Sequence, residues 1–200
     1  MQRHGAGSQV VDVDVAEAGA LHHRLQRRLV LDTYRLSLAT GSLSSAADFM
    51  EMGQLALQAG NEEEARQVVD KGFAAGALGS GAEAERHKRL RDLVARKVAE
   101  AKANQAAAEA EAKAAKDGDG LVKLGFARAM GGDTAAGLQT MQQGIAKGGL
   151  KRPEDAKLHL GIAQVLAGDA KAQATLRSVG GSDGTADLAR LWSLYAKRRN

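Results

Sequence analysis

Glycine recurs in this chain in three triplets that share one internal spacing of seven and then twelve residues. The triplets are Gly53, Gly60 and Gly72, then Gly125, Gly132 and Gly144, then Gly161, Gly168 and Gly180. The second and third triplets lie 36 residues apart, and the first precedes the second by 72 residues, twice that period. A fixed period of this length predicts an array of helical hairpins that bury their apolar faces against one another.

Each copy contains two apolar-periodic segments separated by a glycine, which predicts a helix, a turn and a second helix. The second copy is the clearest example, with segments at residues 121–130 and 138–145. The turn glycine can adopt the positive φ that ends a helix. The earlier glycine of the copy, Gly125 or Gly161, has no side chain, so we expect it where the two helices of a hairpin touch.

The resulting prediction is an all-α fold, an αα-hairpin solenoid closed by a C-terminal capping helix. Residues 1–18 have weak periodicity and are expected to form a disordered or adventitious arm, because no second strand exists to pair with their alternating valines. Residues 19–200 are expected to form the helical repeat domain, with its first helix ending at Gly41. Within it we expect hairpins at about 45–78, 82–116 (degenerate), 118–148 and 153–180, and a cap at 184–199. The degenerate segment has no turn glycine, so we expect it to be a long helix with a largely exposed second half, and a break near Asn104 is left open.

The repeat resembles the tetratricopeptide repeat, which carries a Leu-Gly pair on its first helix. Leu124-Gly125 and Leu160-Gly161 occupy those positions, and Met52-Gly53 is a weaker match. The period of 36 is also similar to that of Sel1-like repeats, built from the same hairpin. The resemblance covers about residues 45–180. This sequence departs from the family by lacking the closing proline and by placing Gln173 where a small residue is usual.

Four phrases resemble the C-terminal part of longer proteobacterial tetratricopeptide proteins. They are DTYRLSLATG at 32–41, HKRLRDL at 87–93, KGGLKRPEDAK at 147–157 and DGTADLARLW at 183–192. Such proteins usually begin with an export signal and further repeats. The resemblance therefore implies a fragment or a late start, with a periplasmic location if the parent is exported and a cytoplasmic one otherwise.

Composition disfavours several classes of partner. No run of about 18 apolar residues is present, so no membrane span is expected. The formal net charge of +4 on 200 residues is small, and the basic runs at 22–28, 86–91 and 197–199 mostly lack interleaved aromatics. We therefore expect solvated helix faces rather than a nucleic-acid surface. The chain has no cysteine, which excludes thiol chemistry and disulfides.

Motifs that suggest catalysis or metal binding lack the context they need. Ser182 stands in a Gly-x-Ser-x-Gly pattern, but a helix precedes it and no histidine follows it. Asp117 and Asp119 start like a calcium loop, yet Leu121 and Arg128 occupy later ligand positions. The histidines have no companions at metal-ligand spacing. We therefore expect no enzyme activity, no cofactor and no metal.

The function predicted from these observations is a non-enzymatic protein-protein interaction scaffold. Its partner would be a peptide or helix of unknown identity, with a homo-oligomer left open. The alternative is a structural C-terminal fragment of a longer repeat protein with no binding role of its own. The resemblance implies a groove lined from the first helix of each hairpin, here by Met50, Gln54, Leu57, Val122, Phe126, Met130, Leu158, Ile162 and Val165. Burial of Phe126, Met130 and Ile162 would mark these positions as interior instead.

Overall fold

The computed structural model describes residues 27–199, and this part of the chain is entirely helical apart from its turns and loops. The elements are η1 (Arg27–Leu29), α2 (Val30–Thr40), α3 (Ala46–Ala59), α4 (Glu62–Ala74), α5 (Ala84–Ala114), α6 (Asp119–Met130), α7 (Thr134–Lys147), α8 (Pro153–Ala167), α9 (Ala172–Arg177) and α10 (Thr185–Arg199). The prediction of an all-α fold is confirmed. The arm expected at residues 1–18 lies outside the described residues.

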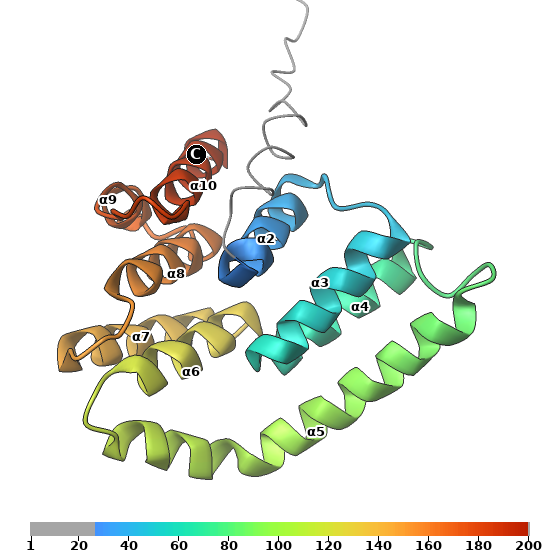
Figure 1. Ribbon diagram of the computed structural model, residues 1–200, viewed down its shortest axis with the longest axis horizontal. Coiled ribbons are helices and arrows are strands. Elements are labelled where there is room, and N and C mark those ends of the chain that lie inside the picture. Colours follow the sequence, from blue (N-terminus) through green and yellow to red (C-terminus); the bar gives the residue numbers. More distant parts are fainter. Residues whose placement is uncertain (1–26, 200) are drawn as a thin grey trace, which may run out of the picture.

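The helices form an arc with α2 on its inner side (Figure 1). The pair α3–α4, the pair α6–α7 and the group α8–α10 follow one another around α2, and the long α5 runs along the outside. Two apolar clusters hold the arc together. One joins α3, α4 and the first half of α5, and the other joins α6 to α10. Each cluster buries apolar area that one hairpin could not bury alone.

The repeat glycines explain why the hairpins are closely packed. A Cβ added at Gly125 would lie 2.6 Å from the carbonyl oxygen of Gly137 on α7, and one at Gly161 would lie 2.5 Å from Cδ2 of Leu176 on α9. Both glycines therefore sit where two helices touch, as predicted. The turn glycines Gly60, Gly132 and Gly168 have φ of 76°, 104° and 70°, values that disfavour residues with a Cβ.

The segment at 82–116, expected to be a long helix in the place of a degenerate hairpin, is the single helix α5, which runs unbroken through Asn104. Leu90, Val94 and Val98 pack into the α3–α4 cluster. Between Val98 and Ala112 no residue of α5 is buried. The second half of α5 is thus a largely exposed connector between two packed parts.

The third copy departs from the other two in its second helix, since α9 has only six residues. Gln173 replaces the usual small residue there, and its side chain donates to the backbone oxygen of Ser193 on α10 at 2.7 Å. The Ser193 hydroxyl donates back to Gln173 Oε1 at 2.6 Å. Helix α10 adds the fully buried Leu188 and Trp192 to the cluster. The short hairpin is therefore completed by α10.

Candidate functional site

The nine positions expected to line an open groove are interior or half-buried in this structure. Phe126, Met130 and Ile162 are 4%, 7% and 0% exposed. Met50, Val122, Leu158 and Val165 are also buried, while Gln54 and Leu57 are half-buried. Met50 and Leu57 belong to the α3–α4 cluster, whereas the six from Val122 onward belong to the α6–α10 cluster. The open apolar strip expected from the resemblance is therefore absent, because the chain's own helices cover these side chains.

Helix α2 occupies the inner side of the arc and packs against both clusters. Leu29, just before α2, belongs to the same cluster as Phe126, and Leu36 and Ala39 pack on that cluster. Leu31, by contrast, belongs to the α3–α4 cluster. Two sides of one helix thus join two parts of the arc that are distant in sequence. We call the inner side of the arc, formed by α3, α4, α6, α8 and the start of α10, the concave groove.

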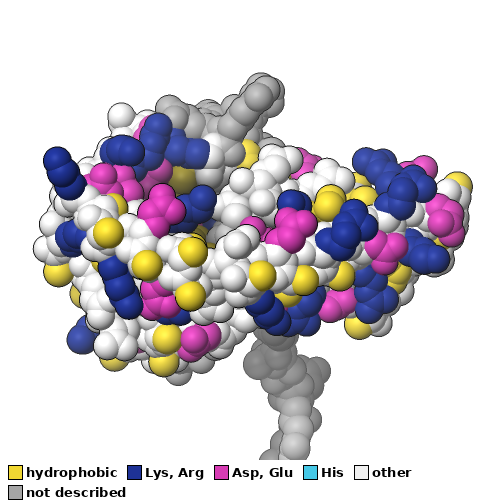
Figure 2. All heavy atoms as spheres, turned by 90° about the horizontal axis from the view of Figure 1, so that it is seen from below, with side chains coloured by type: hydrophobic (Ala, Val, Ile, Leu, Met, Phe, Trp, Pro, Cys, Tyr) yellow, Lys and Arg dark blue, Asp and Glu magenta, His cyan; other side chains and the backbone are white. Residues whose placement is uncertain are grey.

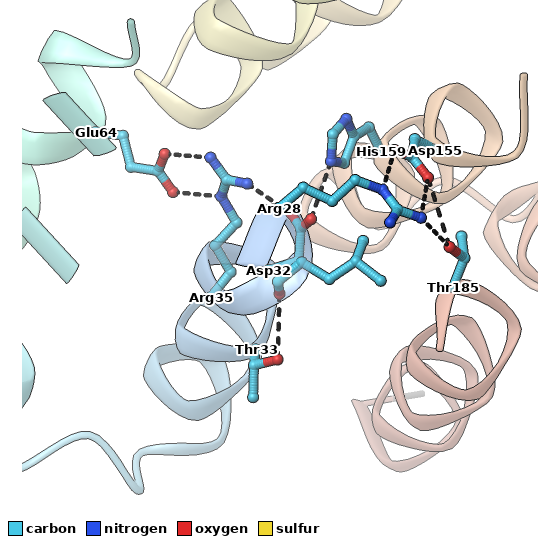
Figure 3. A network of polar contacts seen from close by, with 9 residues as sticks. Arg28, Asp32, Thr33, Arg35, Glu64, Asp155, His159 and Thr185 are labelled. Carbon is cyan, nitrogen blue, oxygen red and sulfur yellow. Dashed lines mark hydrogen bonds and ion pairs between the residues drawn. The ribbon is translucent and has the colours of Figure 1, made fainter. Parts of the chain in front are cut away.

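Arg35 is the central polar contact between α2 and the groove (Figure 3). Its Nε and Nη2 donate to the two carboxylate oxygens of Glu64 on α4 at 2.7 and 2.6 Å. Its Nη1 donates to Asp32 Oδ1, one turn back on α2, at 2.6 Å. The guanidinium also lies over the Phe126 ring, 4.6 Å from the centroid. Forked pairing of this kind is strong and directional, so Arg35 fixes α2 against α4 and α6.

Asp32 connects the same network to α8. Its Oδ2 lies 3.0 Å from Nε2 of His159, whose ring stacks on Phe126 with centroids 4.1 Å apart. Asp32, Arg35 and Glu64 are all at least 94% buried. Buried charges are retained only when they are paired and hydrogen-bonded. Each member of this network therefore requires the others.

Arg28 forms a second contact with α8 and with the start of α10. Its Nε donates to Asp155 Oδ2 at 2.8 Å, and its Nη2 donates to Asp155 Oδ1 and the Thr185 hydroxyl at 3.3 and 3.2 Å. The same Nη2 also donates to Asp183. Arg28 and Arg35 are seven residues apart, about two helical turns, so both face the groove.

These contacts shift the pKa values of Asp32, Asp183 and Arg35. Burial alone would raise the pKa of Asp32, but the neighbouring His159 and the Arg35 guanidinium outweigh burial and lower the pKa to about 2. Hydrogen bonds from Thr185, followed by Arg28, lower the pKa of Asp183 to about 2. Burial would lower the pKa of Arg35, yet Glu64 and Asp32 raise it instead. Each ionised form is therefore stabilised by its partners.

A cleft of about 420 Å³ remains between α2, α3, α6 and α8. Leu31, Leu55, Val122 and Phe126 contribute apolar side chains to its lining, and Arg28, Asp32, Arg35, Asn61, Asp119, Lys123, Arg152, Asp155 and His159 contribute polar ones. Helix α2 thus occupies the concave groove without filling it.

Asn61, at the start of α4, is only 5% exposed, yet its side chain makes no capping hydrogen bond. It differs in this from Ser45, which forms a full capping box with Asp48 on α3. The side chain of Asn61 therefore lines the cleft instead of closing the helix terminus.

The outer face along α5 carries mixed charge, with basic side chains gathered mainly toward one end (Figure 2). That end is interleaved with acids, since Arg86 pairs with Glu83 and Arg91 with Asp70. Within residues 27–199 no group of three histidine or acidic side chains could hold a metal ion. No described helix is both long and apolar enough to span a bilayer. The concave groove is accordingly the best-defined candidate site.

Sequence reasoning missed the polar residues of this site. His159 reads as an isolated residue, and Asp32 and Arg35 read as part of an ordinary amphipathic helix. The available signal was the i, i+3 spacing of Asp32 and Arg35, which puts opposite charges on one helix face beside apolar residues. Nothing in that spacing identifies Glu64 or His159 as partners.

Comparison of the chain with protein-family models, with curated proteins and with solved structures finds no match.

Proposed function

We propose that this protein is a non-enzymatic protein-protein interaction scaffold that binds an α-helix in its concave groove. The observation that carries the proposal is α2 itself. It is an amphipathic helix that lies in the groove and is held by apolar contacts and by charge pairs to α4, α8 and the start of α10. A surface that already accommodates one helix has the shape and chemistry to accommodate another.

The repeat pattern supports the same proposal. Stacked helical hairpins present an extended concave surface, which repeat proteins use for binding. The resemblance to tetratricopeptide and Sel1-like repeats adds protein binding as the expected activity of such a surface. The alternative, a structural fragment of a longer repeat protein, predicts that the groove never exchanges its occupant.

Site-specific photocrosslinking in the source cell tests the proposal. A photoreactive residue at Lys123, which lines the cleft, should capture a protein partner. The same residue at Ala106, on the exposed second half of α5, provides the matched control and should not capture that partner. The captured protein is then purified, and its binding to the isolated chain is measured. Equal capture at both positions, or a purified candidate that does not bind, would remove support for the scaffold.

A further inference from the structure

Arg28 in η1 and Arg35 in α2 occupy two separate sets of acidic partners in the concave groove. Arg35 meets the carboxylate of Glu64, and Arg28, seven residues earlier, meets Asp155 and Asp183. Without Arg28 and Arg35, these three carboxylates would face the groove with no arginine between them. A helix that covers Glu64, which is 5% exposed, desolvates its carboxylate and therefore has to supply a counter-charge. The side chains of Asp155 and Asp183 stay 17% and 34% exposed, so a cation at the second position adds a weaker, partly solvated ion pair.

The contacts at the two arginine positions require a planar group that donates several hydrogen bonds, as well as a positive charge. Arg35 engages both oxygens of Glu64 while lying over the Phe126 ring, and Arg28 makes two hydrogen bonds to Asp155. A planar guanidinium satisfies such forked and stacked contacts, whereas the ammonium of lysine is a point charge and does not. His159 sets a third requirement. Its Nε2 lies 3.0 Å from Oδ2 of Asp32, four residues after Arg28, so the occupant needs an acid at that position.

The cleft beside α2 shows where another helix could bind better. Leu31 of α2 lines it together with Leu55, Val122 and Phe126, and about 420 Å³ stays unfilled. A larger apolar side chain at the position of Leu31 would bury additional apolar surface there. Helix α2 thus satisfies the polar requirements of the groove but not its full apolar capacity.

We infer that the concave groove selects a partner helix with the pattern Arg-x2-Φ-Asp-x2-Arg, where Φ is a large apolar residue, and that this helix displaces α2. The inference rests on the proposed function and specifies the chemistry of its ligand. Because α2 is tethered, it competes at a high effective concentration. The partner must therefore bind the groove more tightly than α2 does, and an aromatic residue at Φ supplies the additional contact.

A labelled peptide of residues 27–41 is the probe, and the receptor is the full chain carrying Arg28→Gln and Arg35→Gln, which loosens its own α2. The unmodified peptide should bind saturably. A peptide with both arginines replaced by lysine keeps its charge and should bind at least about tenfold more weakly, equivalent to about 1.4 kcal/mol. A peptide with Leu31→Phe should bind more tightly, and one with Thr40→Ser, a change at an exposed position, should match the unmodified peptide.

A second receptor guards against misfolding of the double variant. The native chain receives a protease site inserted between the exposed Gly41 and Ser42 and is cut after folding, so that its unaltered α2 can exchange with the labelled peptide. Exchange should show the same order of peptide affinities.

Each outcome of the two assays has one meaning. Equal binding of the arginine and lysine peptides would overturn the inference and leave helix binding intact. Absence of binding to both receptors would overturn the inference and the proposed function together. Concentration-dependent dimers of the native chain that exchange α2 would identify a second copy as the occupant, and would overturn its assignment to another protein.

Discussion

Gly125 on α6 and Gly137 on α7 approach so closely that a Cβ added to either would lie 2.6 Å from the carbonyl oxygen of the other. The obstruction is backbone, which cannot move aside without separating the helices. The α6–α7 hairpin therefore depends on two glycines that face one another, and only one of them belongs to the recurring triplets.

Replacing Gly125 by alanine should destabilise the protein by about 1–3 kcal/mol, because overpacking outweighs the gain of about 1 kcal/mol in helix propensity. Gly161→Ala should cost less, since its nearest neighbour is the movable side chain of Leu176. Gly180→Ala is the matched control, because its nearest neighbour lies 3.5 Å away. Urea unfolding monitored by circular dichroism gives the order, and equal stabilities for all three would contradict it.

Arg35→Gln should lower the free energy of unfolding by about 3–5 kcal/mol, because Asp32 and Glu64 would remain buried without their shared cation. Arg86→Gln is the control, since the Arg86–Glu83 pair is exposed and such pairs contribute about 0–1 kcal/mol. Thermal and urea unfolding of both variants measure the difference. Similar effects of the two substitutions would mean that the buried network does not hold α2.

Stability should fall as pH drops from about 4 towards 2. The folded-state pKa of Asp32 is about 2 against an ordinary value of 3.8, so the unfolded chain takes up the proton first. The ionised form contributes about 2 kcal/mol above this window, and the contribution is lost through it.

Asp32→Asn should remove this part of the pH dependence, whereas Asp92→Asn, at an exposed position on α5, should leave it in place. Urea titrations at pH 5, 4, 3 and 2 provide the measurement. An unchanged slope in Asp32→Asn would show that another group is responsible.

Backbone amides in the second half of α5 should exchange with deuterium faster than those in its first half. Leu90, Val94 and Val98 anchor the first half in a cluster. In the second half no residue between Val98 and Ala112 is buried, and ion pairs such as Glu109 with Arg128, at 3.1 Å, connect it to α6. Segments with few buried contacts open at lower free-energy cost. Mass spectrometry of exchanged peptides resolves the two halves, with α7 as a packed reference. Uniformly slow exchange along α5 would contradict the expectation.

The all-helical class of the fold and the turns at several glycines could be predicted from the sequence, for a physical reason. Turns that need positive φ and contacts that exclude a Cβ both require glycine, so the spacing of residues such as Gly60 and Gly125 records local geometry directly. The place of α2 was not predictable in this way. Its position depends on the contacts of Arg35 with Glu64 and of Asp32 with His159. Helical periodicity predicts that one face of α2 is buried, but it does not identify the helices that cover that face.

The groove positions show a similar division. The resemblance to tetratricopeptide repeats placed Val122, Phe126 and Ile162 on helices that do lie on the inner side of the arc, near α2. It could not show whether these side chains are exposed. Whether such a face is a binding surface or an interior depends on an additional helix, and here that helix comes from the same chain.

The position of α2 also constrains the order in which parts of the protein can fold during synthesis. Its partners Asp155 and His159 follow Arg28 and Asp32 by 127 residues. At synthesis rates of roughly 5–20 residues per second, α2 emerges from the ribosome about 6–25 s before those partners exist. During that time Leu29, which belongs to the α6–α10 cluster, has no finished cluster to enter. The contacts that join the N-terminal end of the described chain to α8 are thus among the last to form.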